Sequence, residues 1–196
     1  IAQYRVTGHA ADPTVTVPGG TYTEPQTVTL ETTTDGATIL YTTNGAEPNA
    51  LDGMVYTNPI EISRNTTLKF TAVKQDWDSA AVITETYAFD TAAPELTPAG
   101  GTFITSQSVS MSTSTPEATI YYTLDGSEPT PTSGTVYSAP ISVDESMTIR
   151  ALTHRDGWND ASVTATYELQ TPAPVFDPTE ATVSGTGLKA NLSCPG

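Results

Sequence analysis

Apolar and polar residues alternate over many short stretches of this chain. Val28 and Leu30 share one face of a stretch, and Leu68, Phe70 and Ala72 share one face of another, while the positions between them are threonine or lysine. A period of two over a few residues is typical of a β-strand with one buried face and one face in water. No long window keeps the 3.6-residue period of a helix. The pattern therefore predicts an all-β protein.

Between residues 13 and 89 the chain holds seven such stretches, separated by turn residues. The expected strands are 13–17, 26–33, 37–43, 53–56, 59–63, 66–74 and 80–89. Seven short strands in about 80 residues indicate two packed antiparallel sheets of the immunoglobulin type. The sequence lacks the Cys–Trp–Cys signature of antibody domains, so "immunoglobulin-like" describes the architecture alone.

The sequence repeats itself after a shift of 81 residues. The stretch LYTTNGAEP at 40–48 corresponds to YYTLDGSEP at 121–129, and GMVYTNPIEI at 53–62 corresponds to GTVYSAPISV at 134–143. Trp77 corresponds to Trp158, and Trp158 is followed by the loss of one residue, so that Tyr87 corresponds to Tyr167. Two long copies in the same order predict two tandem β-sandwiches.

The repeat boundaries predict four segments. Residues 1–11 match the last strand of a preceding repeat and a linker, and residues 12–90 form the first immunoglobulin-like repeat. Residues 91–170 form the second repeat, and residues 171–196 match the opening strands of a truncated third one. We therefore expect two tandem immunoglobulin-like or fibronectin-III-like sandwiches with a partial third repeat, cut from a longer array.

The repeated phrase joins a strand to a turn. The dipeptides Asn44-Gly45 and Asp125-Gly126 tolerate the positive φ that a tight reversal requires. Pro48 and Pro129 follow three residues after each glycine. Because proline donates no hydrogen bond to a sheet, we expect the chain to leave the sheet there.

These motifs resemble a known family. The pattern YTxDGxEP, then VYxxPI, then TLxxxAxxxGW and a final tyrosine strand, is similar to the C-terminal domain of chitobiase and β-hexosaminidase. The first copy departs from it at Asn44, Ala46 and Asp76. The resemblance covers both complete repeats and the partial third. It implies a non-catalytic accessory or spacer module outside the cell, of a kind found in tandem in bacterial secreted proteins, and it implies no hexosaminidase activity.

The composition narrows the possible partners. The formal net charge is −15, with 22 acidic residues against 7 basic ones, which opposes binding to nucleic acid and to anionic membrane surfaces. The 38 threonines favour a half-exposed pleated surface. No apolar run reaches the length of a membrane span.

The oxygen-rich loops around the two tryptophans suggest calcium as the one possible cofactor. Candidate ligands are Asp76, Asp78, Asp156, Asn159 and Asp160. Calcium takes six to eight oxygen ligands, but neither EF-hand nor RTX spacing occurs here. Solubility and mutual repulsion are the simpler explanation of the acidic charge, and the binding of a divalent cation is the alternative.

Trp77 and Trp158 are the candidate ligand-binding residues. A tryptophan at the same loop position in both copies either packs the loop against a sandwich or a neighbouring repeat, or stacks on the ring of a sugar. The sequence leaves both interpretations open.

The sequence predicts no catalytic site. His9 and His154 are not shared between the repeats, and we expect both side chains to face solvent. No GxSxG motif occurs, and turn chemistry explains most of the scattered carboxylates. Cys194 corresponds to an inward-facing position, so it is either a small core residue or an exposed thiol.

Two functions remain open at this point. We expect a non-catalytic spacer or fibre-forming region of an exported bacterial protein, located outside the cell or on its surface. Its partners would be neighbouring repeats or identical subunits of a filament. The alternative is a carbohydrate-binding accessory module of a secreted glycoside hydrolase, with a polysaccharide as the partner.

Overall fold

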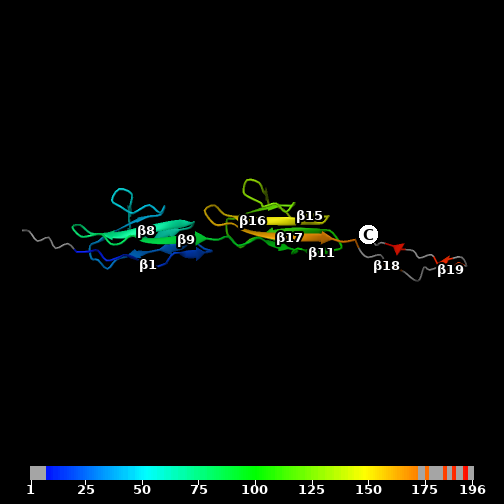
Figure 1. The fold of residues 1–196 in the computed structure, drawn as a ribbon, viewed down its shortest axis with the longest axis horizontal. Helices are drawn as coiled ribbons and strands as arrows, with labels where there is room; N and C mark the ends of the chain where they lie inside the picture. Colours follow the sequence, from blue (N-terminus) through cyan, green and yellow to red (C-terminus); the bar gives the residue numbers. More distant parts are fainter. Residues whose placement is uncertain (1–7, 172–174, 177–182, 185–186, 189–191, 194–196) are drawn as a thin grey trace, which may run out of the picture. The chain divides into compact units, whose positions relative to one another are not determined.

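The protein is built from β-strands. The computed structural model describes residues 8–171, 175–176, 183–184, 187–188 and 192–193, and no helix occurs among them. Figure 1 shows the chain in sequence colours, with the strands labelled. Among the described residues, no helix is long and apolar enough to cross a membrane. The prediction of an all-β protein is confirmed.

Two layers of strands form the first repeat. One layer is a five-stranded sheet in the order β2-β9-β8-β5-β6, and two strand pairs, β3–β7 and β1–β4, form the other. The bounds are β1 Thr14–Val15, β2 Gly20–Tyr22, β3 Gln26–Val28, β4 Leu30–Glu31, β5 Thr38–Thr42, β6 Met54–Val55, β7 Ile60–Ile62, β8 Thr66–Val73 and β9 Ile83–Phe89.

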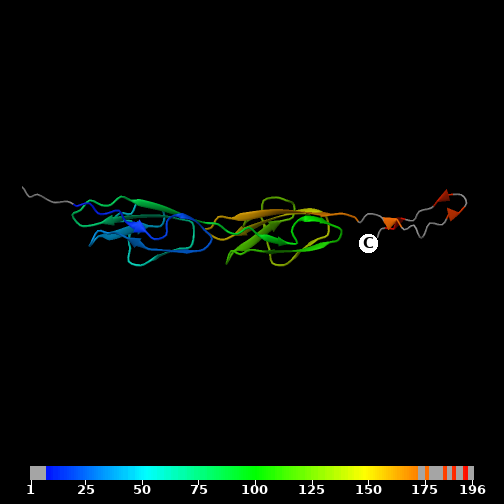
Figure 2. The ribbon, with the colours of Figure 1, turned by 90° about the horizontal axis from the view of Figure 1, so that it is seen from below.

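The second repeat has the same arrangement of strands. Its five-stranded sheet has the order β11-β17-β16-β13-β14, and its three-stranded sheet has the order β10-β12-β15. The long strands β16 and β17 run side by side in both ribbon views (Figures 1 and 2). The bounds are β10 Glu95–Thr97, β11 Gly101–Phe103, β12 Gln107–Ser112, β13 Thr119–Thr123, β14 Thr135–Val136, β15 Ile141–Val143, β16 Met147–His154 and β17 Ala161–Leu169.

Four short strands follow the second repeat. β18 (Val175–Phe176) pairs with β21 (Leu192–Ser193), and β19 (Val183–Ser184) pairs with β20 (Gly187–Leu188), both antiparallel. The predicted third-repeat position of Cys194 lies outside the described residues.

Alternation does not predict one strand of each five-stranded sheet. β2 pairs in parallel with β9, with Gly20 opposite Tyr87, and β11 pairs in parallel with β17, with Gly101 opposite Tyr167. The glycine before each strand allows this pairing, because a Cβ on Gly19 would lie 2.7 Å from the backbone oxygen of Thr86. A glycine-rich stretch of three paired residues has too little alternation for period analysis to detect.

The repeated tyrosines Tyr87 and Tyr167 are fully buried in their sandwiches. The hydroxyl of Tyr87 donates a hydrogen bond to the carbonyl of Val17 at 2.6 Å, and that of Tyr167 donates to Pro98 at 2.7 Å. A buried hydroxyl is tolerated because each one has an acceptor.

The repeated turn motif has a structural role for most of its residues. The side-chain oxygen of Asn44 accepts a hydrogen bond from the backbone N–H of Ala46 at 3.0 Å, and Gly45 has φ 78°. Glu47 forms an ion pair with Lys69 of β8. Pro48 is buried, and it lies six residues after the end of β5 at Thr42.

The chain divides into two compact units that do not follow the repeat boundaries. The first contains residues 1–93, 113–120 and 152–162, and the second contains residues 94–112, 121–151 and 163–196. The loop that carries Trp158 thus belongs to the unit formed mainly by the first repeat. The segment limits predicted from the sequence stay predictions.

Candidate functional site

A tight turn presents Trp158 after strand β16. The backbone N–H of Trp158 donates to the carbonyl of Arg155 at 3.0 Å, and Gly157 has φ 76°, which favours glycine. The Arg155 guanidinium lies 4.4 Å from the centre of the indole ring. A cation over the ring and a closed turn hold the indole in one orientation.

The indole of Trp158 is part of the core of the first unit. It is only 6% exposed, and its ring centre lies 5.1 Å from that of Phe89. The indole Nε1 donates a hydrogen bond to the carbonyl of Ser63 at 2.8 Å. A buried tryptophan needs an acceptor for this N–H group, and the Ser63 loop provides it.

Backbone hydrogen bonds bind the Trp158 turn to the chain that follows β9. Asn159 donates to the carbonyl of Phe89 at 2.7 Å and accepts from the N–H of Thr91 at 3.0 Å, which forms a parallel bridge at Asp90. The N–H of Asn65 donates to the carbonyl of Gly157 at 2.8 Å.

Two asparagine side chains complete this connection. The side-chain oxygen of Asn65 accepts from the N–H of Phe89 at 2.7 Å, and its amide donates to the side-chain oxygen of Asn159 at 2.8 Å. The amide of Asn159 donates to a carboxylate oxygen of Asp90 at 2.7 Å. We call this set the Trp158 joint; it consists of Ser63, Asn65, Phe89, Asp90, Thr91, Gly157, Trp158 and Asn159.

An ion pair at the rim of the joint contributes little to the stability of the joint. Arg64 and Asp156 approach to 3.9 Å, but both side chains are largely exposed. Exposed pairs of this kind contribute between zero and about 1 kcal/mol. Packing and hydrogen bonds therefore dominate the joint.

The backbone part of the joint also occurs at Trp77. Asp78 donates to the carbonyl of Gly8 at 2.9 Å and accepts from the N–H of Ala10 at 2.9 Å. His9 forms the parallel bridge with Asp78 that Asp90 forms with Asn159. These partners differ by the same shift of 81 residues, so one arrangement of the backbone occurs twice.

The two tryptophans differ in burial. Trp77 is 38% exposed, and Lys74 lies 4.3 Å from its ring centre. A Cβ on Gly8 would lie 2.6 Å from the indole, in the position where Phe89 meets Trp158. The sequence offers Trp77 and Trp158 as equivalent, but only Trp77 keeps an accessible ring surface.

The candidate calcium ligands are dispersed rather than gathered. Asp160 contacts the Nδ1 of His154 at 2.8 Å, so His154 is paired and half-buried rather than simply solvent-facing. Asp156 is near Arg64, and the side chain of Asn159 belongs to the joint. Asp76 adopts φ 65°, and Asp78 is used through its backbone. In the described part of the chain, no group of three or more His, Cys, Asp and Glu side chains could hold a metal ion.

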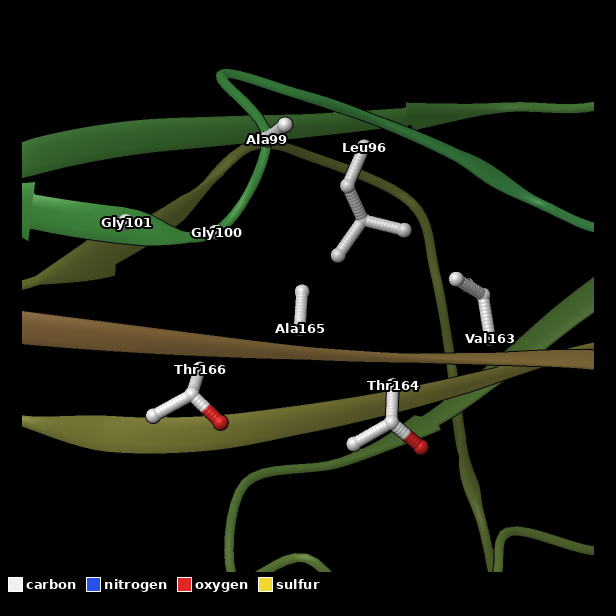
Figure 3. A pocket seen from close by; sticks show the side chains of 8 residues that line it. All are labelled: Leu96, Ala99, Gly100, Gly101, Val163, Thr164, Ala165 and Thr166. Carbon is white, nitrogen blue, oxygen red and sulfur yellow. The ribbon is translucent and has the colours of Figure 1, made fainter.

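A surface pocket lies in the second repeat, beside the parallel pair β11–β17. Its volume is about 480 Å³. In Figure 3 the side chains of Leu96, Val163 and Ala165 point into one space, while Thr164 and Thr166 point to the other side of β17. Gly100 lies at the edge of this space.

Among the residues that the structure describes, three side chains have a pKa shifted from its ordinary value. Burial, followed by the negative charge of Glu85 and then by Tyr22, raises the pKa of Tyr87 to about 12. Burial raises the pKa of Tyr167. Hydrogen bonds from the hydroxyl and then the backbone of Ser127 lower the pKa of Asp125. All three are explained by packing or turn geometry, which is unlike the converging groups of an active site.

Most residues of the Trp158 joint carry no signal in the sequence. Ser63, Asn65 and Asp90 lie in two separate loops, and nothing in their local sequence marks them as partners of Trp158. The repeated tryptophan is the one signal that could have pointed to the site.

Comparisons with known proteins identify a family and structures that are distantly similar. The model of the Chitobiase/beta-hexosaminidase C-terminal domain matches residues 17–84 and 98–166, which is well over half of the chain. No curated protein matches at a significant level. A crystal structure of Drosophila N-cadherin EC1-3 is 12% identical, with a TM-score of 0.26, and the match covers 84% of this chain and 65% of that chain. So low a TM-score supports no argument.

The matched domain is a non-catalytic accessory domain of chitobiases and hexosaminidases. Its two matches begin 81 residues apart and fall on the two sandwiches described above. The resemblance seen in the sequence is confirmed: this chain belongs to the chitobiase/β-hexosaminidase C-terminal domain family, which it contains twice in tandem.

Proposed function

We propose that this region is a non-catalytic spacer that restrains successive domains of an exported, cell-surface or filament-forming protein. The observation that supports the proposal is the Trp158 joint. A connection with a buried indole and several backbone hydrogen bonds is more than a flexible tether requires.

The linker itself supports this role. In the segment TAAPEL at 91–96, the N–H of Thr91 bonds to Asn159 and the N–H of Ala92 donates to the hydroxyl of Thr115 at 2.7 Å. Pro94 limits the backbone freedom of the residue before it. A linker whose amides are bound loses much of the freedom that a hinge needs.

The surface chemistry is consistent with a role outside the cell. A net charge of −15 keeps neighbouring molecules apart and opposes non-specific binding to nucleic acid. The partners would be further repeats of the same chain or identical subunits in a filament.

Small-angle X-ray scattering on matched variants tests the spacer function. Trp158→Ala should broaden the distribution of interatomic distances relative to the unaltered chain, because the joint is opened. Trp77→Ala removes the same side chain from the corresponding loop and should leave the distribution unchanged. Identical profiles for all three folded proteins would contradict the proposal.

A second candidate function is carbohydrate binding as an accessory module of a secreted glycoside hydrolase. It is favoured by the exposed surface of Trp77, since an accessible indole can pack on the apolar face of a sugar ring. Insoluble polysaccharide pull-down should then retain the unaltered chain and lose Trp77→Ala. Retention of Trp77→Ala at the original level would contradict this function.

A further inference from the structure

The two repeats differ at one position beside the parallel strand pair. In the first repeat, a carboxylate oxygen of Glu85 accepts a hydrogen bond from the backbone N–H of Gly19 at 2.5 Å. Gly19 and Glu85 correspond to Gly100 and Ala165 of the second repeat. The second repeat therefore has the same glycine but lacks the acidic side chain.

The missing side chain coincides with the pocket in Figure 3. A Cβ placed on Gly19 would lie 2.7 Å from a carboxylate oxygen of Glu85, whereas one placed on Gly100 would lie 3.3 Å from the Cβ of Ala165. The methyl group of Ala165 cannot accept a hydrogen bond. Ala165 and Gly100 both line the pocket of about 480 Å³.

The titration of the two core tyrosines agrees with this difference. The negative charge of Glu85 contributes to the raised pKa of Tyr87. The pKa of Tyr167 is raised by burial alone. The second repeat thus retains the buried tyrosine but has alanine at the position of Glu85.

We propose that the pocket of the second repeat binds the carboxylate of a small aliphatic acid, in the position that Glu85 fills in the first repeat. The N–H of Gly100 donates to the carboxylate, and Leu96, Val163 and Ala165 pack against its hydrocarbon stem. The inference does not depend on the spacer function, since the pocket lies within one repeat.

The pocket should bind carboxylates with low affinity, and it should prefer an ionised ligand to a neutral one. The hydrogen bond from Gly100 becomes charge-assisted when the acceptor is ionised, which makes it stronger than one to a neutral oxygen. The acidic surface of the protein opposes an anion, and an open pocket leaves part of the ligand in water. We expect a dissociation constant on the order of 1–10 mM for a two- or three-carbon acid.

Titration of the ¹⁵N-labelled chain with sodium acetate and sodium propionate tests the site. Ionic strength is held constant with sodium chloride. The amide signal of Gly100 should move to saturation, and the signals of Gly101 and Ala165 should follow. Propionamide has the same shape without the charge, and it should bind at least tenfold more weakly. Equal binding of propionamide, or a Gly100 signal that does not move, would overturn the proposal.

Three variants locate the site. Ala165→Glu supplies the carboxylate from the chain and should weaken acetate binding at least tenfold. Thr164→Glu adds the same charge on the other side of β17 and should retain most of the binding. In Glu85→Ala, the amide signal of Gly19 should also move when acetate is added. If Ala165→Glu folds and still binds acetate unchanged, the pocket is not the site.

Discussion

Phe89 and Trp158 lie far apart in the sequence, yet their ring centres are 5.1 Å apart in one hydrophobic core. Phe89 ends the last strand of the first repeat, and Trp158 comes from a loop of the second. Because the contact is buried and the N–H of the indole has an acceptor, this pair is expected to stabilise the protein.

Removing the buried indole of Trp158 should lower the free energy of unfolding far more than removing the more exposed indole of Trp77. We expect Trp158→Ala to lower the free energy of unfolding by about 3–5 kcal/mol, because it leaves a cavity in the core. Trp77→Ala should cost less than about 1.5 kcal/mol. Urea denaturation, followed by near-ultraviolet circular dichroism, measures both changes. Equal costs would show that the two loops pack alike in solution.

Asn65 should be essential for the joint despite its exposed position. Asn65→Ala removes the acceptor of the Phe89 N–H and the donor to Asn159, and should cost about 1–3 kcal/mol. Asn58→Ala is the matched control, because the amide of Asn58 donates to the neighbouring Thr57 hydroxyl on the surface and takes no part in the joint. Hydrogen exchange at the Phe89 amide should accelerate in the first variant and stay unchanged in the second.

Two adjacent glycines should respond differently to the same substitution. A Cβ on Gly100 would lie 2.7 Å from the backbone oxygen of Thr166, whereas the nearest atom to a Cβ on Gly101 is 3.7 Å away on Phe103. Gly100→Ala should therefore displace β11 and cost about 2 kcal/mol or more. Gly101→Ala should be nearly neutral. Thermal unfolding of the two variants gives the comparison, and a neutral Gly100→Ala would contradict the close approach.

Alkaline pH should destabilise the first repeat through Tyr87. Its pKa is raised from 10.0 to about 12 by folding, so the folded state holds the proton more tightly than the unfolded state does. The resulting stability is present below pH 10 and is lost as the pH rises from 10 to about 12. Tyr87→Phe should be less stable at pH 8, where the hydrogen bond to Val17 is lost, and its stability should fall less steeply above pH 10. Parallel slopes for both proteins would contradict the assignment.

Sequence periodicity accounts for much of the fold. The alternation of Leu68, Phe70 and Ala72 places three buried side chains on β8, as expected. The shift of 81 residues predicts two copies of one sandwich, because corresponding residues take corresponding positions in the sheets. Prediction fails at Gly19 and Gly20, where a parallel pairing depends on a close backbone approach that leaves no hydrophobic pattern.

The sequence predicts less of the candidate site than of the fold. Trp77 and Trp158 are identical in type and in local position, and their difference in burial depends on contacts from distant loops. Ser63 contributes only its backbone carbonyl, which carries no signature in its side chain. The pocket beside Ala165 is visible only when the two copies are compared in space, because alanine on a strand is unremarkable by itself.

The assignment of residues 152–162 to the first unit affects how the protein can be divided. A cut between residues 90 and 91 follows the repeat boundary predicted from the sequence, but it separates Trp158 from Phe89, Ser63 and Asn65. The isolated second half would present a bare indole to water and tend to adhere to other molecules. The isolated first half would lack the Trp158 indole that fills part of its core. Studies of single repeats would therefore observe two newly exposed apolar surfaces. Non-specific binding measured on such fragments would come from the cut and not from the intact protein.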